Sequence, residues 1–215
     1  MLQLVITGGS GGLGLALAAA FHSPLWQIAT PSHGDLDVTN AAAVRGFFHD
    51  RAVDLLVCAA GLTRDAPLAR LAESAWDEVV AVNFSAARAC AAAALPGMLE
   101  RGSGHIVFIS SFSARHPPHG QVAYATAKAG LLGLTQQLAA RHGCHGIRVN
   151  AILPGFLETP MTRPVTATRR AAVLAEHALG TFNTPAAVAG FIHFLHDQLP
   201  HTSGQIFQLD SRAAT

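Results

Sequence analysis

Charged residues are scarce in this chain of 215 residues. Asp, Glu, Lys and Arg together make up 13% of it, and they balance to a formal net charge of +1. A binder of nucleic acid needs a concentrated positive surface, so we expect no nucleic-acid partner. Half of the residues are hydrophobic, which argues against disorder and predicts a substantial buried core.

Cysteines are few as well. The three cysteines, Cys58, Cys90 and Cys144, are an odd number at unrelated spacings. This excludes a disulfide framework and a pair of close metal-ligand couplets. We therefore expect a reducing compartment and a cytoplasmic location.

Long hydrophobic runs are also missing. The apolar start, Leu2 to Ile6, is too short for a membrane span or the core of a signal peptide. The alanine-rich stretch from Ala86 to Leu95 is interrupted by Arg88 and followed by Pro96. We expect a buried helix there, and no contact with a membrane.

Histidine, by contrast, is abundant, with twelve copies. Two pairs, His116/His119 and His193/His196, have spacings that could suit a metal ion. Neither pair is accompanied by further ligands at metal-site spacing, so we expect solvated histidines and no metal.

Short β-branched runs alternate with longer segments rich in Ala and Leu, and this alternation is typical of parallel βαβ units. We predict a single α/β domain over residues 1–215, a Rossmann fold with a doubly wound, mostly parallel sheet. The predicted strands are Leu2–Thr7, Gln27–Thr30, Leu36–Val38, Leu55–Ala59, His105–Ser110, Arg148–Leu153 and Gln205–Leu209. The predicted helices are Gly12–Phe21, Ala41–Arg51, Ala75–Leu99, Tyr124–His142, Thr168–Ala178 and Pro185–Leu195, with caps such as Asn40, Ser74 and Thr184.

The connection between the second and third predicted strands is unusually short. Only five residues, Pro31 to Asp35, separate them, whereas a crossover between parallel strands normally needs a dozen or more. Either the crossover helix is missing or the third strand is vestigial.

A glycine-rich turn follows the first predicted strand. It reads Thr7-Gly8-Gly9-Ser10-Gly11-Gly12-Leu13-Gly14 and runs directly into a helix. Glycines allow a tight turn and a close approach of backbone amides to a pyrophosphate, which the helix N-terminus also favours. An ordinary flexible loop is the competing interpretation, but the strand before and the helix after favour a dinucleotide site.

Tyr124 and Lys128 lie four residues apart on a predicted helix, so their side chains share one face. A neighbouring ammonium favours the phenolate, which should move the pKa of the tyrosine toward the range of a general acid. Such a pair alone is commonly a surface pair. Ser111 strengthens the interpretation, because it follows the fifth predicted strand at the sheet edge where ligands bind. Asn83 breaks an apolar helical stretch, either as a structural asparagine or as a site residue.

Together these residues resemble the short-chain dehydrogenase/reductase family. The resemblance rests on Thr7-Gly8-x-x-x-Gly12-x-Gly14, Asp37-Val38, Cys58-Ala59-Ala60-Gly61, Asn83, Ser111, Tyr124 with Lys128, and Pro154-Gly155 followed by Thr159. Residues 154–162 and the ending Ser203-Gly204-Gln205 resemble those of 3-oxoacyl-carrier-protein and acetoacetyl-CoA reductases.

The resemblance implies a nicotinamide-dependent reduction of a ketone to a secondary alcohol. Its implied catalytic residues are Asn83, Ser111, Tyr124 and Lys128. Its implied cofactor contacts are Gly8, Ser10, Gly12, Leu13, Gly14, Asp37, Val38, Ala60, Gly61, Tyr124, Lys128, Pro154, Gly155 and Thr159. A non-catalytic NAD(P)-sensing or scaffold protein on the same fold is the alternative.

Two departures from the family pattern weaken the expected cofactor affinity. The short passage after Thr30 removes much of the wall that usually surrounds the adenosine. Cys58-Ala59 stands where the family usually has Asn-Asn, which braces the central sheet.

The cofactor preference is read from the end of the second predicted strand. An acidic residue there usually reads the 2′-hydroxyl of NAD, but Thr30, Ser32 and His33 occupy the stretch and no carboxylate precedes Asp35. We therefore favour NADP(H) over NAD(H).

The segment from Pro160 to Gly180 lies where the family places a substrate lid. It carries Arg163, Arg169 and Arg170, which either form a solvated basic face or attract a carrier-linked or CoA-linked substrate. The resemblance, and apolar residues around the helix from Tyr124 to Ala140, also predict a homo-oligomer, a dimer or a tetramer.

Overall fold

A computed structural model describes residues 1–212. Its centre is one sheet of six parallel strands in the order β2-β1-β3-β4-β5-β6. The strands are β1 (Leu2–Thr7), β2 (Trp26–Ala29), β3 (Leu55–Cys58), β4 (Gly104–Ile109), β5 (Ile147–Leu153) and β6 (Ile206–Gln208). The predicted α/β class with a doubly wound parallel sheet is confirmed.

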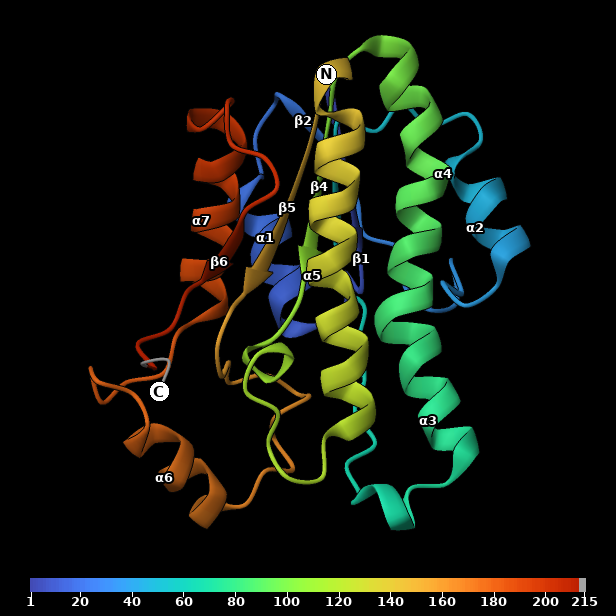
Figure 1. The fold of residues 1–215 in the computed structure, drawn as a ribbon. Helices are drawn as coiled ribbons and strands as arrows, with labels where there is room; N and C mark the ends of the chain where they lie inside the picture. The colour runs from blue at the N-terminus through green and yellow to red at the C-terminus, as the bar shows by residue number, and fades with distance from the viewer. Residues whose placement is uncertain (213–215) are drawn as a thin grey trace.

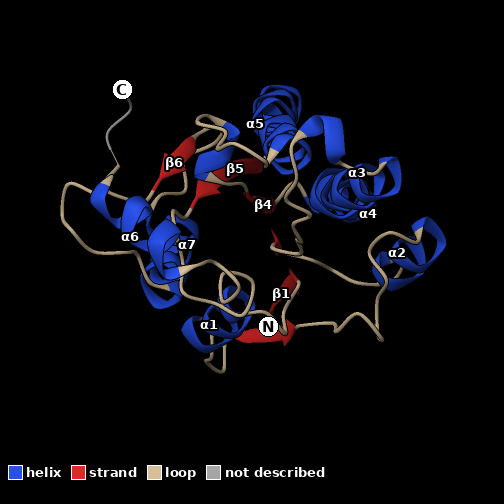
Figure 2. Ribbon diagram, turned by 90° about the horizontal axis from the view of Figure 1, so that it is seen from below, coloured by secondary structure: helices blue, strands red, loops and turns tan. Residues whose placement is uncertain are grey.

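Helices cover both faces of this sheet (Figures 1 and 2). The longer helices are α1 (Gly12–Ala20), α2 (Ala41–Phe48), α3 (Glu73–Val80), α4 (Ala86–Arg101), α5 (Val122–His142), α6 (Ala167–Ala175) and α7 (Pro185–Gln198). Short helical turns are η1 (Leu68–Arg70), η2 (Ala81–Ser85), η3 (Phe112–Ala114) and η4 (Gly143–His145). Helices α1 and α7 pack on one face, and α2, α4 and α5 pack on the other.

The two faces form two separate hydrophobic cores because neighbouring residues of a strand point to opposite sides. In β3, Leu56 packs toward α2 and α4, whereas Leu55 and Val57 pack toward α1 and α7. All three side chains are fully buried. A strand covered on both faces is continuously apolar, which explains the uninterrupted run that made β3 and β4 recognisable in the sequence.

The strand order reverses between β1 and β3, since β2 lies on one side of β1 and β3 on the other. Open α/β sheets bind ligands in the crevice outside the carboxyl ends of their strands at such a switch point. The glycine-rich loop follows β1 there, and residues 59–61 follow β3. The topology therefore places the functional site at this edge.

The prediction of a strand at Leu36–Val38 is wrong. The segment forms turns: Asp35 Oδ2 accepts hydrogen bonds from the amide and hydroxyl of Ser32, and Asp37 Oδ1 accepts two from Thr39. These local bonds compete with a sheet ladder. No crossover helix lies between residues 30 and 35 either, so β2 is the edge strand of the described sheet.

The predicted helix Ala75–Leu99 is longer than expected and is interrupted. Helices α3 and α4 are joined by the π-helical turn η2 into a continuous helix, Glu73–Arg101. Ser74 was expected to cap this helix but lies inside it, after Ala72 at the N-cap. Asn40 and Thr184 do cap α2 and α7, each through its side-chain oxygen.

This continuous helix is long and apolar enough to span a membrane by length and composition alone. A core helix passes the same test, and here Cys90, Ala94 and Met98 are buried against the sheet. In the described fold one face of this helix packs on the sheet.

The expectation of solvated histidines is wrong for His196, whereas the side chain of His193 is 40% exposed. His196 is partly buried, stacks on the buried His105 and packs edge-on to Trp26. His193 packs edge-on to Phe21. His116 stacks on Phe112. These rings fill gaps beside aromatic side chains, a packing that spacing alone does not reveal.

Candidate active site

The glycine-rich loop is shaped for a group that needs close access to the backbone. Gly8 has a φ of +72°, and a Cβ there would lie 2.8 Å from the backbone of Ala60. A Cβ on Gly14 would lie 2.5 Å from the Gly8 carbonyl oxygen. Gly11 precedes α1 without a side-chain cap, so the first amides of the helix remain available. These features fit a dinucleotide pyrophosphate.

A cavity of about 500 Å³ opens beside this loop. That volume lies within the range of ligand-binding pockets. Most of the predicted site residues line it: Gly8, Gly12, Leu13, Gly14, Gly61, Ser111, Tyr124, Lys128, Pro154, Gly155 and Thr159. The fold thus gathers residues separated by about 150 positions around one space.

Ser111 and Tyr124 face each other across the start of α5. Ser111 follows β4 and precedes the turn η3, where its hydroxyl accepts a hydrogen bond from the Ser113 amide (3.1 Å). Burial raises the pKa of Tyr124 to about 12, a hydrogen bond with Ser111 opposes the rise, and the charge of Asp65 adds to it. The prediction that Lys128 lowers this pKa is wrong for the chain alone. The phenol is therefore protonated at neutral pH.

Lys128 lies one turn along α5 from Tyr124, with its side chain in the cavity wall. It is 4% exposed, and its Nζ donates to the Ile109 carbonyl at 2.9 Å. Burial lowers the pKa of this lysine to about 8, because desolvation disfavours the ammonium. Nζ lies 5.7 Å from the centre of the Tyr124 ring, so the two side chains do share a site.

Asn83 occupies the middle of the π-helical turn η2 and is 1% exposed. Its Nδ2 donates to the carbonyls of Leu62 (2.8 Å) and Val79 (2.9 Å). Its Oδ1 is buried and has no hydrogen-bond partner among residues 1–212. A Cβ built on Gly61 would lie 2.8 Å from this Oδ1 and 3.5 Å from Lys128 Nζ. An acceptor without a partner thus faces the glycine beside the lysine, in the kind of π-bulge often found at functional sites.

Four predicted cofactor contacts and Asn83 do not line the cavity. Ser10 is exposed, and Ala60 donates its amide to Thr7 Oγ1 at 3.4 Å beneath the glycine loop. Asp37 and Val38 lie in the turns after β2, away from the cavity lining. The structure therefore encloses the nicotinamide end of the expected site much more than the adenosine end.

The three arginines of the expected lid differ in environment. Arg169 is exposed but lines the cavity. Arg170 pairs with Glu158 and lies over the rings of Phe156 and Phe182. Arg163 is exposed and outside the cavity lining. Only Arg169 is placed to meet a ligand.

Two site residues were missed by the sequence analysis. Arg212 lines the same cavity, and Asp210 holds it with bonds of 2.7 and 2.6 Å. A signal existed, since both charges follow the last strand at the same carboxyl edge that carries Ser111 and Pro154.

The comparisons with a family model and with known proteins agree on one family. A family model described as short chain dehydrogenase matches residues 25–170. The chain is 39% identical over 159 residues to the 3-oxoacyl-[acyl-carrier-protein] reductase FabG of Thermotoga maritima, a match that covers 74% of this chain and 65% of that protein. It is 31% identical over 230 residues to FabG of Escherichia coli, covering 96% and 94%. It is also 39% identical to a (3R)-3-hydroxyacyl-CoA dehydrogenase of Canis lupus familiaris, covering 74% and 64%.

Solved structures share the fold. One similar protein, described as an NAD(P) dependent gluconate 5-dehydrogenase from Beutenbergia cavernae and crystallised with bound NADP, has a TM-score of 0.88 at 28% identity. The match covers 98% of this chain and 95% of that one. Another, gox2181, has a TM-score of 0.90 at 26% identity, covering 98% and 94%.

Proposed function

Since the chain belongs to the short-chain dehydrogenase family, we propose that it reduces a ketone to a secondary alcohol with a nicotinamide cofactor. The observation that carries this proposal is the meeting of Ser111, Tyr124 and Lys128 on the wall of one cavity beside the glycine loop. The loop would hold the pyrophosphate, and Pro154, Gly155 and Thr159 would line the nicotinamide side. A nicotinamide bound there supplies the hydride.

The two hydroxyl groups act on the oxygen of the substrate carbonyl. Ser111 donates a hydrogen bond to it and polarises the C=O bond. Tyr124, protonated at neutral pH because burial raises its pKa to about 12, gives its proton to the same oxygen as the carbonyl carbon gains the hydride. The double bond becomes a C–H and an O–H bond, which balances the reduction.

Lys128 and Asn83 support the proton donor. With the cofactor in place, the ammonium of Lys128 would bind the ribose hydroxyls of the nicotinamide and would stabilise the phenolate left after the transfer. The unpartnered Asn83 Oδ1 beside Gly61 would hold a water that returns a proton through Lys128. These roles make Asn83 a positioning residue.

We propose a 3-oxoacyl thioester or similar carbonyl, free or linked to a carrier or CoA, as the substrate. The names of the FabG and hydroxyacyl-CoA relatives support this class. Arg169, the lid arginine that lines the cavity, is the residue placed to attract a phosphopantetheine arm. Neutralising Arg169 should raise the Michaelis constant for a carrier-linked substrate more than for a free ketoester, and an equal rise would contradict the carrier role.

We propose NADP(H) as the preferred cofactor. The absence of a carboxylate between Thr30 and His33 supports it, as does the NADP in the related Beutenbergia structure. The feature that opposes it is Asp35, whose carboxylate turns back onto Ser32 and could accept bonds from a ribose 2′-hydroxyl. Assays with both cofactors decide the preference.

We further propose that residues 1–215 act as one dinucleotide-binding domain in a cytoplasmic homo-oligomer, a dimer or a tetramer. Helices α4 and α5 support this, because their alanine-rich surfaces extend beyond the face that packs on the sheet. Light scattering at micromolar concentration should give a mass at least twice 22.3 kDa. A 22.3 kDa species alone would contradict the oligomer.

The proposed activity is tested by mixing the protein with NADPH or NADH and a β-ketoester. The expected result is a steady loss of absorbance from the reduced cofactor. Binding of the cofactor without turnover, across a panel of ketones, would instead favour a non-catalytic sensor on the same fold.

A further inference from the structure

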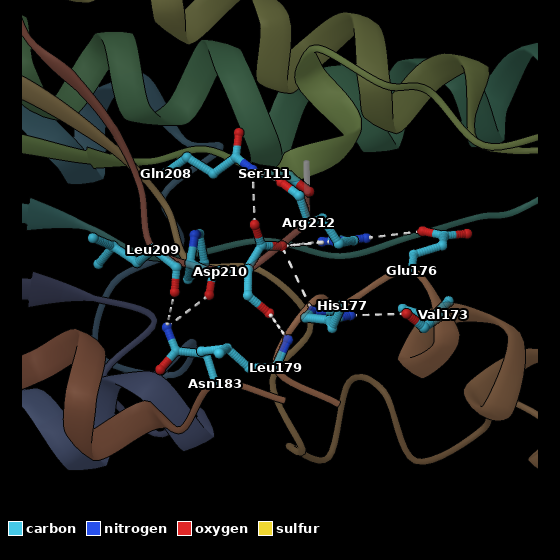
Figure 3. Close-up of polar contacts among 12 residues, drawn as sticks. Ser111, Val173, Glu176, His177, Leu179, Asn183, Gln208, Leu209, Asp210 and Arg212 are labelled. Carbon is cyan, nitrogen blue, oxygen red and sulfur yellow. Dashed lines mark hydrogen bonds and ion pairs between the residues drawn. The ribbon is translucent and has the colours of Figure 1, made fainter. Parts of the chain in front are cut away.

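A buried cluster of charges follows the last strand, outside the catalytic residues described above (Figure 3). The Asp210 side chain is fully buried. Its Oδ2 accepts from Arg212 Nε (2.7 Å) and Nη2 (2.6 Å), and its Oδ1 accepts from Gln208 Nε2 (2.8 Å). Removing an ion pair from water is costly, and a packed apolar core would stabilise a fold as well or better. The cluster therefore invites a functional explanation.

Arg212 reaches from this cluster to the reaction cavity. Its guanidinium carbon lies 3.5 Å from the centre of the Phe112 ring, and Phe112 directly follows Ser111. All three residues line the cavity. The Arg212 guanidinium thus lies over the ring of Phe112. Phe112 is next to Ser111, which is proposed to polarise the substrate carbonyl.

Arg212 has donors left for a ligand. A guanidinium carries five N–H groups, and Asp210 takes those on Nε and one on Nη2. Nη1 forms an ion pair with Glu176 Oε2 at 3.8 Å, which is too long for a hydrogen bond. The remaining N–H groups donate to no carboxylate or carbonyl at hydrogen-bond distance within residues 1–212, yet the residue borders the cavity.

Asp210 itself cannot move away. A Cβ on Gly155 would lie 2.6 Å from Asp210 Cβ, so the loop after β5 packs directly against it. On the other side lies the buried His177 ring, whose Nδ1 donates to the Val173 carbonyl (2.8 Å) and whose Nε2 is 3.8 Å from Asp210 Oδ2 without a hydrogen bond within residues 1–212. The Arg212 fork is therefore fixed before a ligand arrives, which lowers the entropic cost of binding.

We propose that Arg212 recognises a second oxygen of the substrate, the carboxyl-level oxygen of a 3-oxo acid or of its ester or thioester. Asp210 acts as a positioning residue for it. The inference rests on the proposed ketone reduction and narrows it to substrates that carry this second acceptor. A planar fork of N–H donors suits carboxyl oxygens. Because Asp210 and Glu176 both pair with this cation and offset its charge, the acceptor can be a neutral carbonyl as well as a carboxylate.

The test compares three substrates, namely ethyl acetoacetate, acetoacetate and a methyl ketone of similar length without the second oxygen. Arg212→Met keeps the stem and removes the donors, and Arg115→Met, at an exposed position outside the cavity, is the matched control. Losing a hydrogen bond from a charged donor should lower kcat/KM for the two oxo acid derivatives roughly 10- to 150-fold. The methyl ketone should change less than about threefold by this account. If kcat/KM falls more for ethyl acetoacetate, the acceptor is the ester carbonyl; if it falls more for acetoacetate, the acceptor is the carboxylate.

Equal losses for all three substrates, with native circular dichroism, would overturn the proposal, because they would indicate a structural role only. Asp210→Asn should lower the ratio of kcat/KM for the ester over the methyl ketone, whereas an unchanged ratio would remove Asp210 from the positioning role. Arg212→Lys should restore only part of the discrimination, because a lysine lacks the fork.

Saturation-transfer NMR with ethyl 3-hydroxybutanoate, in the presence of cofactor, separates this inference from the proposed function. The ester signal should appear with wild type and Arg115→Met and be lost with Arg212→Met. If no ketone is reduced but this pattern holds, the proposed function fails and Arg212 recognition stands. If the signal does not depend on Arg212, the recognition fails even where reduction is observed.

Discussion

The two ends of the proposed cofactor site differ in how many buried contacts hold their residues in place. At the nicotinamide end, Lys128 and Asn83 are buried, and their nitrogens donate to the carbonyls of Ile109 in β4, Val79 in α3 and Leu62. At the adenosine end, residues 33–35 are exposed and the chain forms only local turns after β2. Proton transfer requires fixed geometry, whereas the adenosine serves as an anchor. The buried, hydrogen-bonded residues therefore lie where the proposed chemistry would take place.

The largest effect should come from the catalytic end. Tyr124→Phe keeps the ring and its packing but removes the proposed proton donor, so turnover should fall about 10²- to 10⁴-fold. Cofactor affinity, measured by fluorescence titration, should be preserved. Since Tyr124 is the only tyrosine in the chain, no second phenol can replace it. Near wild-type turnover in this variant would assign the proton donor to another group.

Lys128, the only lysine in the chain, should make the stability of the cofactor-free protein depend on pH. Its pKa is about 8 when folded, against an ordinary value of 10.5. Between these values the unfolded chain holds more protons, so stability rises with pH, until the raised pKa of Tyr124 opposes it above pH 10. From pH 7 to pH 10, urea unfolding should show wild type gaining about 2 to 3 kcal/mol relative to Lys128→Met. Parallel pH profiles would contradict the buried ammonium.

The glycine loop joins the two ends and should be intolerant of side chains. Gly8→Ala adds a methyl group that meets Ala60 at 2.8 Å at a φ of +72°, so we expect a loss of about 1 to 3 kcal/mol in stability and weaker cofactor binding. Gly46→Ala in α2 is the matched control, because a Cβ there meets nothing within 4 Å. The control should gain about 0.5 to 1 kcal/mol. Equal melting curves for both variants would show that the loop is not as tight as described.

The smallest effect should come from the adenosine end. Asp35→Asn removes the carboxylate that faces Ser32, which should raise the ratio of kcat/KM for NADPH over NADH by about two- to fivefold, as for other exposed charges. Asp50→Asn, an exposed control just after the end of α2, should leave the ratio unchanged. A hundredfold change in this ratio would mean that Asp35 binds the adenosine ribose much more tightly than an exposed turn residue should.

The same contrast explains what the sequence could predict. Periodicity and the glycine motif located β1, β4, α5 and the Tyr124–Lys128 pair, because these features are local. The strand expected at Leu36–Val38 failed because Asp35 and Asp37 form side-chain bonds to nearby residues.

Tertiary contacts lay beyond the sequence analysis. The lowered pKa of Lys128 depends on its burial against β4, and the pairing of Asp210 with Arg212 depends on how the chain turns after β6. The π-helical turn around Asn83 likewise depends on Leu62, which lies 21 residues away.

Transfer of deuterium from cofactor to product tests the central claim most directly. Wild type and Tyr124→Phe would each be incubated with NADPH carrying deuterium at the transferable C4 position and with ethyl acetoacetate, and the product would be examined by mass spectrometry. The account predicts one deuterium on the new carbinol carbon with wild type, and little product in the same time with Tyr124→Phe. Cofactor binding without any deuterated alcohol from wild type, or equal deuterated product from both proteins, would contradict it.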